Sequence, residues 1–144
     1  MKRIFTCSIL LLLAFITQVH AQSLEWKLLK EVEGIRVEYQ VRDYAPTQSQ
    51  YYVLRVKNTN SYDVGINWDY RLTYSNGQEV YNPQSGEHHV GLILKAEQSI
   101  EGNLPRTEEE NFLTLHYRFT GQRGKMVPTA LTDIKLELFK VFTL

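Results

Sequence analysis

The chain has 144 residues, and its 16 basic and 16 acidic residues give a formal charge of zero. A balanced chain without a run of basic residues offers no electrostatic footprint for nucleic acid or for anionic lipid. We therefore expect no nucleic-acid partner.

The N-terminal segment has the features of a secretory signal peptide. Lys2 and Arg3 precede an apolar run, 9–16, that is too short to span a membrane. A small-residue cleavage pattern follows and ends at Ala21. These features predict export to the periplasm, the cell surface or the medium; a retained membrane anchor is the alternative.

Cleavage would change the composition of the remaining chain. Residues 1–21 would be removed, and residues 22–144 would form a single domain without membrane insertion. The only cysteine, Cys7, would leave with the signal peptide, so the exported domain would contain no disulfide. Its stability would then depend on core burial and on hydrogen bonds between strands.

Alternation of apolar and polar residues with a period of two dominates the rest of the chain, and no segment shows a sustained helical stripe. Glu33-Gly34 and Asn76-Gly77 are typical of tight hairpin turns, because glycine accepts a positive φ. In chain order, the predicted strands are 26–32, 35–41, 51–57, 63–74, 79–81, 89–95, 100–102, 112–119 and 133–142. Eight or nine short strands predict an all-β fold, an antiparallel two-sheet β-sandwich.

The segment 63–74 alternates most regularly, with its even-numbered residues apolar or aromatic. This pattern predicts that Trp68 and its even-numbered neighbours fill the core of the sandwich. The alternative is that Trp68, Tyr70 and Tyr74 form a flat platform that stacks on sugar rings. The predicted core comprises Leu54, Val56, Trp68, Tyr70, Leu72, Leu92, Leu115 and Leu136.

The last predicted strand is apolar on both faces. We expect Ile134, Leu136 and Leu138 on one face, and Phe139 and Val141 on the other. Such a strand is usually central, covered on each side. If it lies instead at an edge, it is a template for self-association with a second chain, with Lys140 as the charge that opposes this pairing.

The order of five segments resembles small exported bacterial β-sandwich proteins with immunoglobulin-like topology. These segments are EGIRVEYQV, VLRVKNTN, INWDYRLTYSNGQEV, LILKAEQSIEG and LELFKV, which together cover most of residues 22–144. Several such proteins carry Pro-Gly where this chain has Ala96 and Glu97. The resemblance implies an immunoglobulin-like fold and no activity, because the family is largely without an assigned one.

A second resemblance concerns the segment 26–43, which is similar to the first hairpin of START-type lipid-binding domains. Those domains require a long amphipathic helix across the sheet. The C-terminal segment 133–142 has the pattern of a strand, which argues against this second family.

Four tyrosines are candidate ligand-binding residues, because each lies near a predicted strand end, loop or outer face. An aromatic ring with a hydroxyl suits contact with a polar ligand such as a glycan. Tyrosine is also common in ordinary strands, which is the alternative explanation. The four are Tyr44, Tyr51, Tyr62 and Tyr81.

Metal binding and catalysis have little support in the sequence. His88 and His89 are adjacent and would point to opposite faces of a strand, while His116 lies on another strand. The acidic run 108–110 and the oxygen-rich segment 58–63 are typical of solvated loops. No nucleophile elbow and no phosphate-binding glycine loop occur, so we expect no catalytic residues and no cofactor.

The sequence therefore predicts an exported, non-catalytic binding or structural module whose partner is an unknown protein or glycan at the cell envelope. A carbohydrate-binding module that uses the surface tyrosines is the alternative, and self-association through the last strand is a further one.

Overall fold

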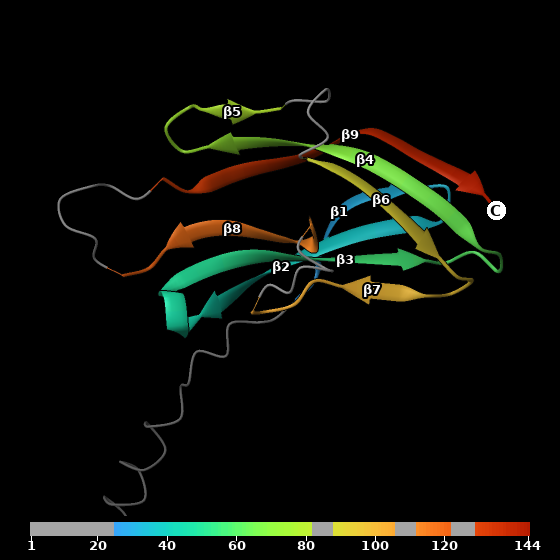
Figure 1. The fold of residues 1–144 in the computed structure, drawn as a ribbon, viewed down its shortest axis with the longest axis horizontal. Helices are drawn as coiled ribbons and strands as arrows, with labels where there is room; N and C mark the ends of the chain where they lie inside the picture. The colour runs from blue at the N-terminus through green and yellow to red at the C-terminus, as the bar shows by residue number, and fades with distance from the viewer. Residues whose placement is uncertain (1–24, 82–87, 106–111, 122–128) are drawn as a thin grey trace, which may run out of the picture.

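The computed structural model of the chain describes residues 25–81, 88–105, 112–121 and 129–144 (Figure 1). This part of the chain contains nine strands, and a short 3-10 turn (η1, Ala45–Thr47) separates the second from the third. The strands are β1 (Lys27–Val32), β2 (Ile35–Tyr44), β3 (Ser49–Asn58), β4 (Val64–Tyr74), β5 (Glu79–Val80), β6 (His89–Leu94), β7 (Ser99–Glu101), β8 (Thr114–Phe119) and β9 (Leu131–Thr143). Among these residues we find no helix with the length and apolarity needed to cross a bilayer.

The strands form two antiparallel sheets packed face to face, so the predicted all-β sandwich is confirmed (Figure 1). The first sheet is five-stranded and has the order β1-β2-β3, with both β7 and β8 paired to the far side of β3. The second sheet is four-stranded, with β9 on one side of β4 and both β5 and β6 on the other. Each central strand therefore has one long neighbour and one neighbour made of two short pieces.

Two tight turns set the register of the hairpins. Glu33 and Gly34 both adopt positive φ values, 48° and 76°, in the turn that joins β1 to β2. Gly77 has a φ of 81° in the turn between β4 and β5, where its amide donates to the carbonyl of Tyr74. The positive φ explains why glycine occupies both positions.

The core lies between the two sheets and is built on the even-numbered residues of β4. Trp68 is fully buried, and its ring stacks on Phe139 of β9 with centroids 5.6 Å apart. A sugar platform on Trp68 is therefore wrong, because water and ligand cannot reach the ring. Of the predicted core, Leu92 and Leu115 are only partly buried and pack against its margin. The buried members are Leu54, Val56, Trp68, Tyr70, Leu72 and Leu136.

β9 lies at an edge of the second sheet and is not the central strand that its apolar faces predicted. A β-bulge places two residues of β9 opposite Trp68, and Leu138 there has a φ of 51°. Beyond the bulge the other parity faces inward, so Phe139 packs on the core while Leu138 is exposed. The expectation that Leu138 shares a face with Leu136 is thus wrong, since the extra residue shifts the alternation.

Asn58 joins the two sheets where β3 ends. Its side chain is fully buried, and Nδ2 donates to the carbonyl oxygens of Tyr62 and Lys95, each at 2.9 Å. Its Oδ1 accepts the backbone N–H of Asn60 at 3.0 Å. Nearby, Asp63 Oδ1 accepts the backbone N–H of Ala96. These oxygens of segment 58–63 are engaged in holding the connections between the sheets.

Candidate functional site

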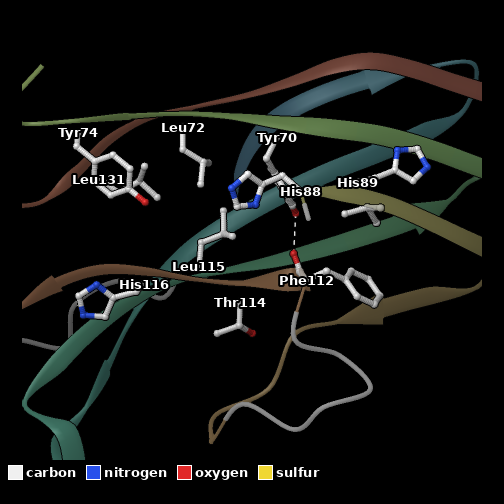
Figure 2. A pocket seen from close by; sticks show the side chains of 11 residues that line it. Tyr70, Leu72, Tyr74, His88, His89, Phe112, Thr114, Leu115, His116 and Leu131 are labelled. Atoms are coloured by element: carbon white, nitrogen blue, oxygen red, sulfur yellow. Dashed lines mark hydrogen bonds between the residues drawn. The ribbon is translucent and has the colours of Figure 1, made fainter. Parts of the chain in front are cut away.

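The described residues form a cleft of about 530 Å³ between the two sheets. We call it the inter-sheet cleft. It lies on the side of the sandwich where each central strand is paired with two short strands. β4 and the start of β6 form one wall, and β8 forms the other (Figure 2). Its inner surface is formed by Tyr70, Leu72, Tyr74, His88, Leu115 and Leu131.

Alternation along β8 decides which of its side chains enter the cleft. Leu115 points toward β4, whereas Thr114 and His116 project from the opposite side of the strand (Figure 2). Thr114 donates from its hydroxyl to the carbonyl of Asn103, which occupies its polar group outside the cleft. The wall contributed by β8 is therefore mainly apolar.

Tyr70 fixes the distance between the two walls at the inner end of the cleft. Its side chain is 2% exposed, and its hydroxyl donates to the carbonyl oxygen of Phe112 at 2.8 Å (Figure 2). Burial raises the pKa of Tyr70 above its ordinary value, so the hydroxyl stays protonated and able to donate. This bond connects β4 of the second sheet to the residues that precede β8 in the first.

His88 is the histidine that points into the cleft, between the side chains of β4 and Leu115 (Figure 2). Its carbonyl accepts the amide of Tyr70 at 3.1 Å, which anchors the backbone at the start of β6. The sequence predicted solvated loop histidines here. A local pattern could not place His88 in a cleft, because its position depends on the pairing of β6 with β4.

His89 is also among the residues that line the cleft, but its ring belongs to a separate polar pair. Its Nδ1 lies 2.8 Å from Oδ1 of Asp69, which is 6% exposed on the outer side of β4. His88 and His89 thus lie on opposite sides of the sheet. Within the described residues, no group of three histidine, cysteine, aspartate or glutamate side chains is arranged to hold a metal ion.

The four candidate tyrosines are placed in three separate regions. Tyr44 and Tyr51 contact each other on the outer face of the first sheet, with ring centroids 6.3 Å apart and planes at 76°. Tyr51 also meets the ring of His116 edge-on, at 5.3 Å and 88°. Because successive rings are nearly perpendicular, this cluster offers no flat surface on which a sugar ring could stack.

The other two tyrosines lie far from this cluster. Tyr62 is 48% exposed in the connection between β3 and β4, at the opposite end of β3 from Tyr51. Tyr81 follows β5 in the second sheet, where the guanidinium of Arg71 lies 3.9 Å from its ring centroid. Among the four, therefore, Tyr44 and Tyr51 alone can contact one small ligand together.

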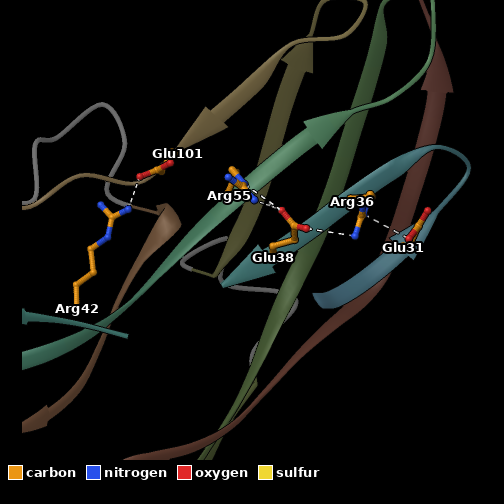
Figure 3. A network of polar contacts seen from close by, with 6 residues as sticks. All are labelled: Glu31, Arg36, Glu38, Arg42, Arg55 and Glu101. Carbon is orange, nitrogen blue, oxygen red and sulfur yellow. Dashed lines mark hydrogen bonds and ion pairs between the residues drawn. The ribbon is translucent and has the colours of Figure 1, made fainter. Parts of the chain in front are cut away.

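The outer face of the first sheet carries a network of ion pairs that the sequence did not reveal (Figure 3). Glu38 is 8% exposed and accepts two hydrogen bonds from Arg55, at 2.9 and 2.6 Å. Arg36 also pairs with Glu38, and Arg42 pairs with Glu101 of β7. Glu38 and Arg55 lie on adjacent strands, whereas Arg42 and Glu101 lie on strands separated by β3, so alternation alone does not show which charges meet.

Trp26 lies against this network. The guanidinium of Arg55 stacks over its ring at 4.1 Å from the centroid, and Arg42 lies 5.6 Å away. Arginine and tryptophan together cover the outer side of β3, where Val53 is fully buried. We attribute a structural role to this network, since its acidic and basic groups neutralise one another.

A search of protein-family models, curated proteins and solved structures found no significant match to this chain.

Proposed function

We propose that this chain is an exported, non-catalytic binding module that holds a small, mainly apolar ligand in the inter-sheet cleft. The observation that carries the proposal is the cleft itself. Its volume of about 530 Å³ falls within the range of small-molecule sites, and its walls combine aliphatic and aromatic side chains with polar groups of histidine and tyrosine.

The chemistry of the walls defines the class of ligand. Leu115 is partly buried and offers apolar surface to the cleft, which favours a hydrocarbon chain or an aryl ring. His88 supplies an imidazole that can donate to or accept from one polar group of the ligand. A molecule with an apolar body and a single polar or anionic group fits this arrangement.

A binding role agrees better with the cleft than a catalytic one. Tyr70 already donates its hydroxyl to Phe112, and Asp69 is engaged with His89 on the outer side of β4. The described residues that line the cleft include no aspartate, glutamate, serine or cysteine. General acid–base or nucleophilic chemistry needs such a partner within hydrogen-bonding distance.

Export and the immunoglobulin-like assignment belong to the same proposal. The signal-peptide pattern of residues 1–21 supports export to the periplasm, the cell surface or the medium. The chain crosses from β3 in one sheet to β4 in the other and returns for β7 and β8, which is the kind of crossing that immunoglobulin-like sandwiches use.

The proposal is tested with 1-anilinonaphthalene-8-sulfonate, an aromatic amphipathic anion whose fluorescence rises on binding. Titration of the purified protein should show saturable binding. Leu115→Trp, which fills the cleft, should weaken this binding at least about tenfold, because the new ring occupies the ligand volume. Leu28→Trp is the matched control: residue 28 is 52% exposed on β1, away from the cleft, and its variant should bind as the unmodified protein does.

A second pair of variants tests the polar contact. His88→Ala should weaken binding of the anionic probe, whereas His89→Ala should not, since the two side chains point to opposite sides of the sheet. The proposal fails if the unmodified protein binds no probe, or if Leu115→Trp binds it as tightly as the unmodified protein.

A further inference from the structure

The C-terminal half of β9 is an open strand edge. Among the described residues, β9 pairs with β4 on one side and with no strand on the other. An unpaired edge presents a row of backbone N–H and C=O groups that can add another strand. This feature is independent of the inter-sheet cleft.

The N-terminal half of the same edge is shielded. β1 approaches β9 around Leu136, where Lys30 Nζ donates to the carbonyl oxygen of Leu136 at 3.0 Å. The bulge at Leu138 then bends the strand. A strand added along the first half would have to displace Lys30, so pairing is restricted to the residues after the bulge.

One hydrogen bond shows which backbone groups face the open side. The amide of Leu144 donates to the carbonyl of Asp63, so it points toward the β4 side. Because backbone groups alternate in direction along a strand, those of Phe139, Val141 and Thr143 point toward the open edge. The carbonyl of Leu136 also points outward, and the one-residue bulge accounts for the change of parity between 136 and 139.

The side chains beside this edge are apolar and exposed. Phe142 is 46% exposed and Leu144 is 63% exposed. The Phe142 ring lies directly over Gly65, where a Cβ atom would come within 2.0 Å of it. One face of the Phe142 ring thus packs on Gly65, while its other face and its edge remain available to a partner.

We propose that two copies of this chain associate through this edge, with residues 139–143 of one β9 antiparallel to those of the other. The two-fold axis passes through Val141, which faces its own counterpart. Phe139 of each copy then faces Thr143 of the other, and these outward backbone groups form about six hydrogen bonds.

Charge and ladder length select this register. With the axis at Val141, Lys140 of each copy lies opposite Phe142 of the other, in the closer, non-hydrogen-bonded type of pair, where a cation can approach an aromatic face. An axis at Lys140 would place two like charges opposite each other, which is destabilising. An axis at Phe142 would leave Phe139 without a partner and would shorten the ladder.

Sedimentation velocity of the purified protein, from about 1 µM to about 300 µM, tests the association. The average mass should rise with concentration toward that of two chains. Val141→Pro should remain at the mass of one chain, because proline removes a donor that faces the open edge and leaves the ladder to β4 intact. Val141→Ala keeps the N–H and should associate as the unmodified protein does.

Three further variants make the result independent of the proline. Phe142→Glu changes an exposed side chain and should abolish association even if Val141→Pro fails to fold. Val141→Cys should form a disulfide-linked dimer, since Cα atoms of such a pair lie about 5.5 Å apart, and Lys140→Cys should not. A constant mass of one chain for the unmodified protein, or association that Phe142→Glu leaves unchanged, would overturn the proposal.

Discussion

The side chain of Asn58 provides the sharpest test of how the two sheets are joined. It makes three hydrogen bonds while fully buried: two from Nδ2 to carbonyl oxygens and one from the amide of Asn60 to Oδ1. Each such bond contributes about 1 kcal/mol net, so Asn58→Ala should lower the free energy of unfolding by about 3 kcal/mol. That is a large fraction of the stability of a small domain.

Asn58→Asp gives the same test a pH dependence. The introduced carboxyl would face the carbonyl oxygens of Tyr62 and Lys95, which disfavour its ionised form. Its pKa in the folded protein should therefore lie above the unfolded value of about 3.9. Stability is then greatest below that value and is lost as the pH rises through the folded pKa.

Urea unfolding of both variants and of the unmodified protein, at about pH 4 and about pH 7, measures these effects. Asn58→Asp should be closer to the unmodified protein at the lower pH. Thr59→Ala is the control, because its exposed hydroxyl donates one bond, to Gly34, and its loss should cost about 0.5 kcal/mol. A cost below about 1 kcal/mol for Asn58→Ala would refute the reasoning, as would a pH-independent difference for Asn58→Asp.

Three other predictions concern stability. Leu138→Gly should raise the free energy of unfolding by about 1 kcal/mol in urea titrations, because the position has a positive φ that glycine adopts without strain. The free energy of unfolding should fall between about pH 10 and pH 12. Burial raises the pKa of Tyr52 to about 12 and also raises that of Tyr70, so the folded chain retains protons that the unfolded chain loses in this range. Tyr52→Phe should make the fall shallower. Gly102→Ala should lower the thermal midpoint of unfolding by several degrees, because a Cβ atom would lie 2.4 Å from a backbone carbonyl oxygen just before β8. Gly91→Ala is the control: a Cβ atom there meets no atom within 4 Å, so the midpoint should be unchanged.

The strands were predictable because their signals are local. Each predicted segment corresponds to a strand, with ends that differ by at most three residues, and the even-numbered residues from Val64 to Leu72 are buried as the alternation indicated. Binary patterning reports which face of a strand is apolar, and a hairpin glycine reports where the chain reverses. Both kinds of information reside in neighbouring residues.

The position of β9 was not predictable for the same reason. Apolar residues at both odd and even positions usually indicate a strand that is covered on both faces. In β9 this pattern results instead from the extra residue at Leu138. The sequence does not indicate this bulge, because position 138 is a leucine, whereas a glycine there would have suggested a positive φ. The alternation before and after the bulge is regular, but the two halves are out of phase.

The candidate site was the least predictable part. Tyr70, His88 and Leu115 belong to three segments that meet only through the pairing of β4 with β6 and the packing of the two sheets. The sequence directed attention to exposed tyrosines, which the fold then distributes over three regions. A cleft between sheets is a property of tertiary arrangement, and its residues look like ordinary core residues in the sequence.

In each sheet, the edge that is made of two short strands affects how a ligand can reach the interior. β6 and β8 are short ladders that end beside the cleft, whereas β2 and β9 run along nearly the whole length of β3 and β4. Short ladders separate at a lower free energy than long ones, because fewer hydrogen bonds break in each event. Detachment of one short strand would admit a molecule to the interior while the long ladders and the stacked rings of Trp68 and Phe139 stay in place.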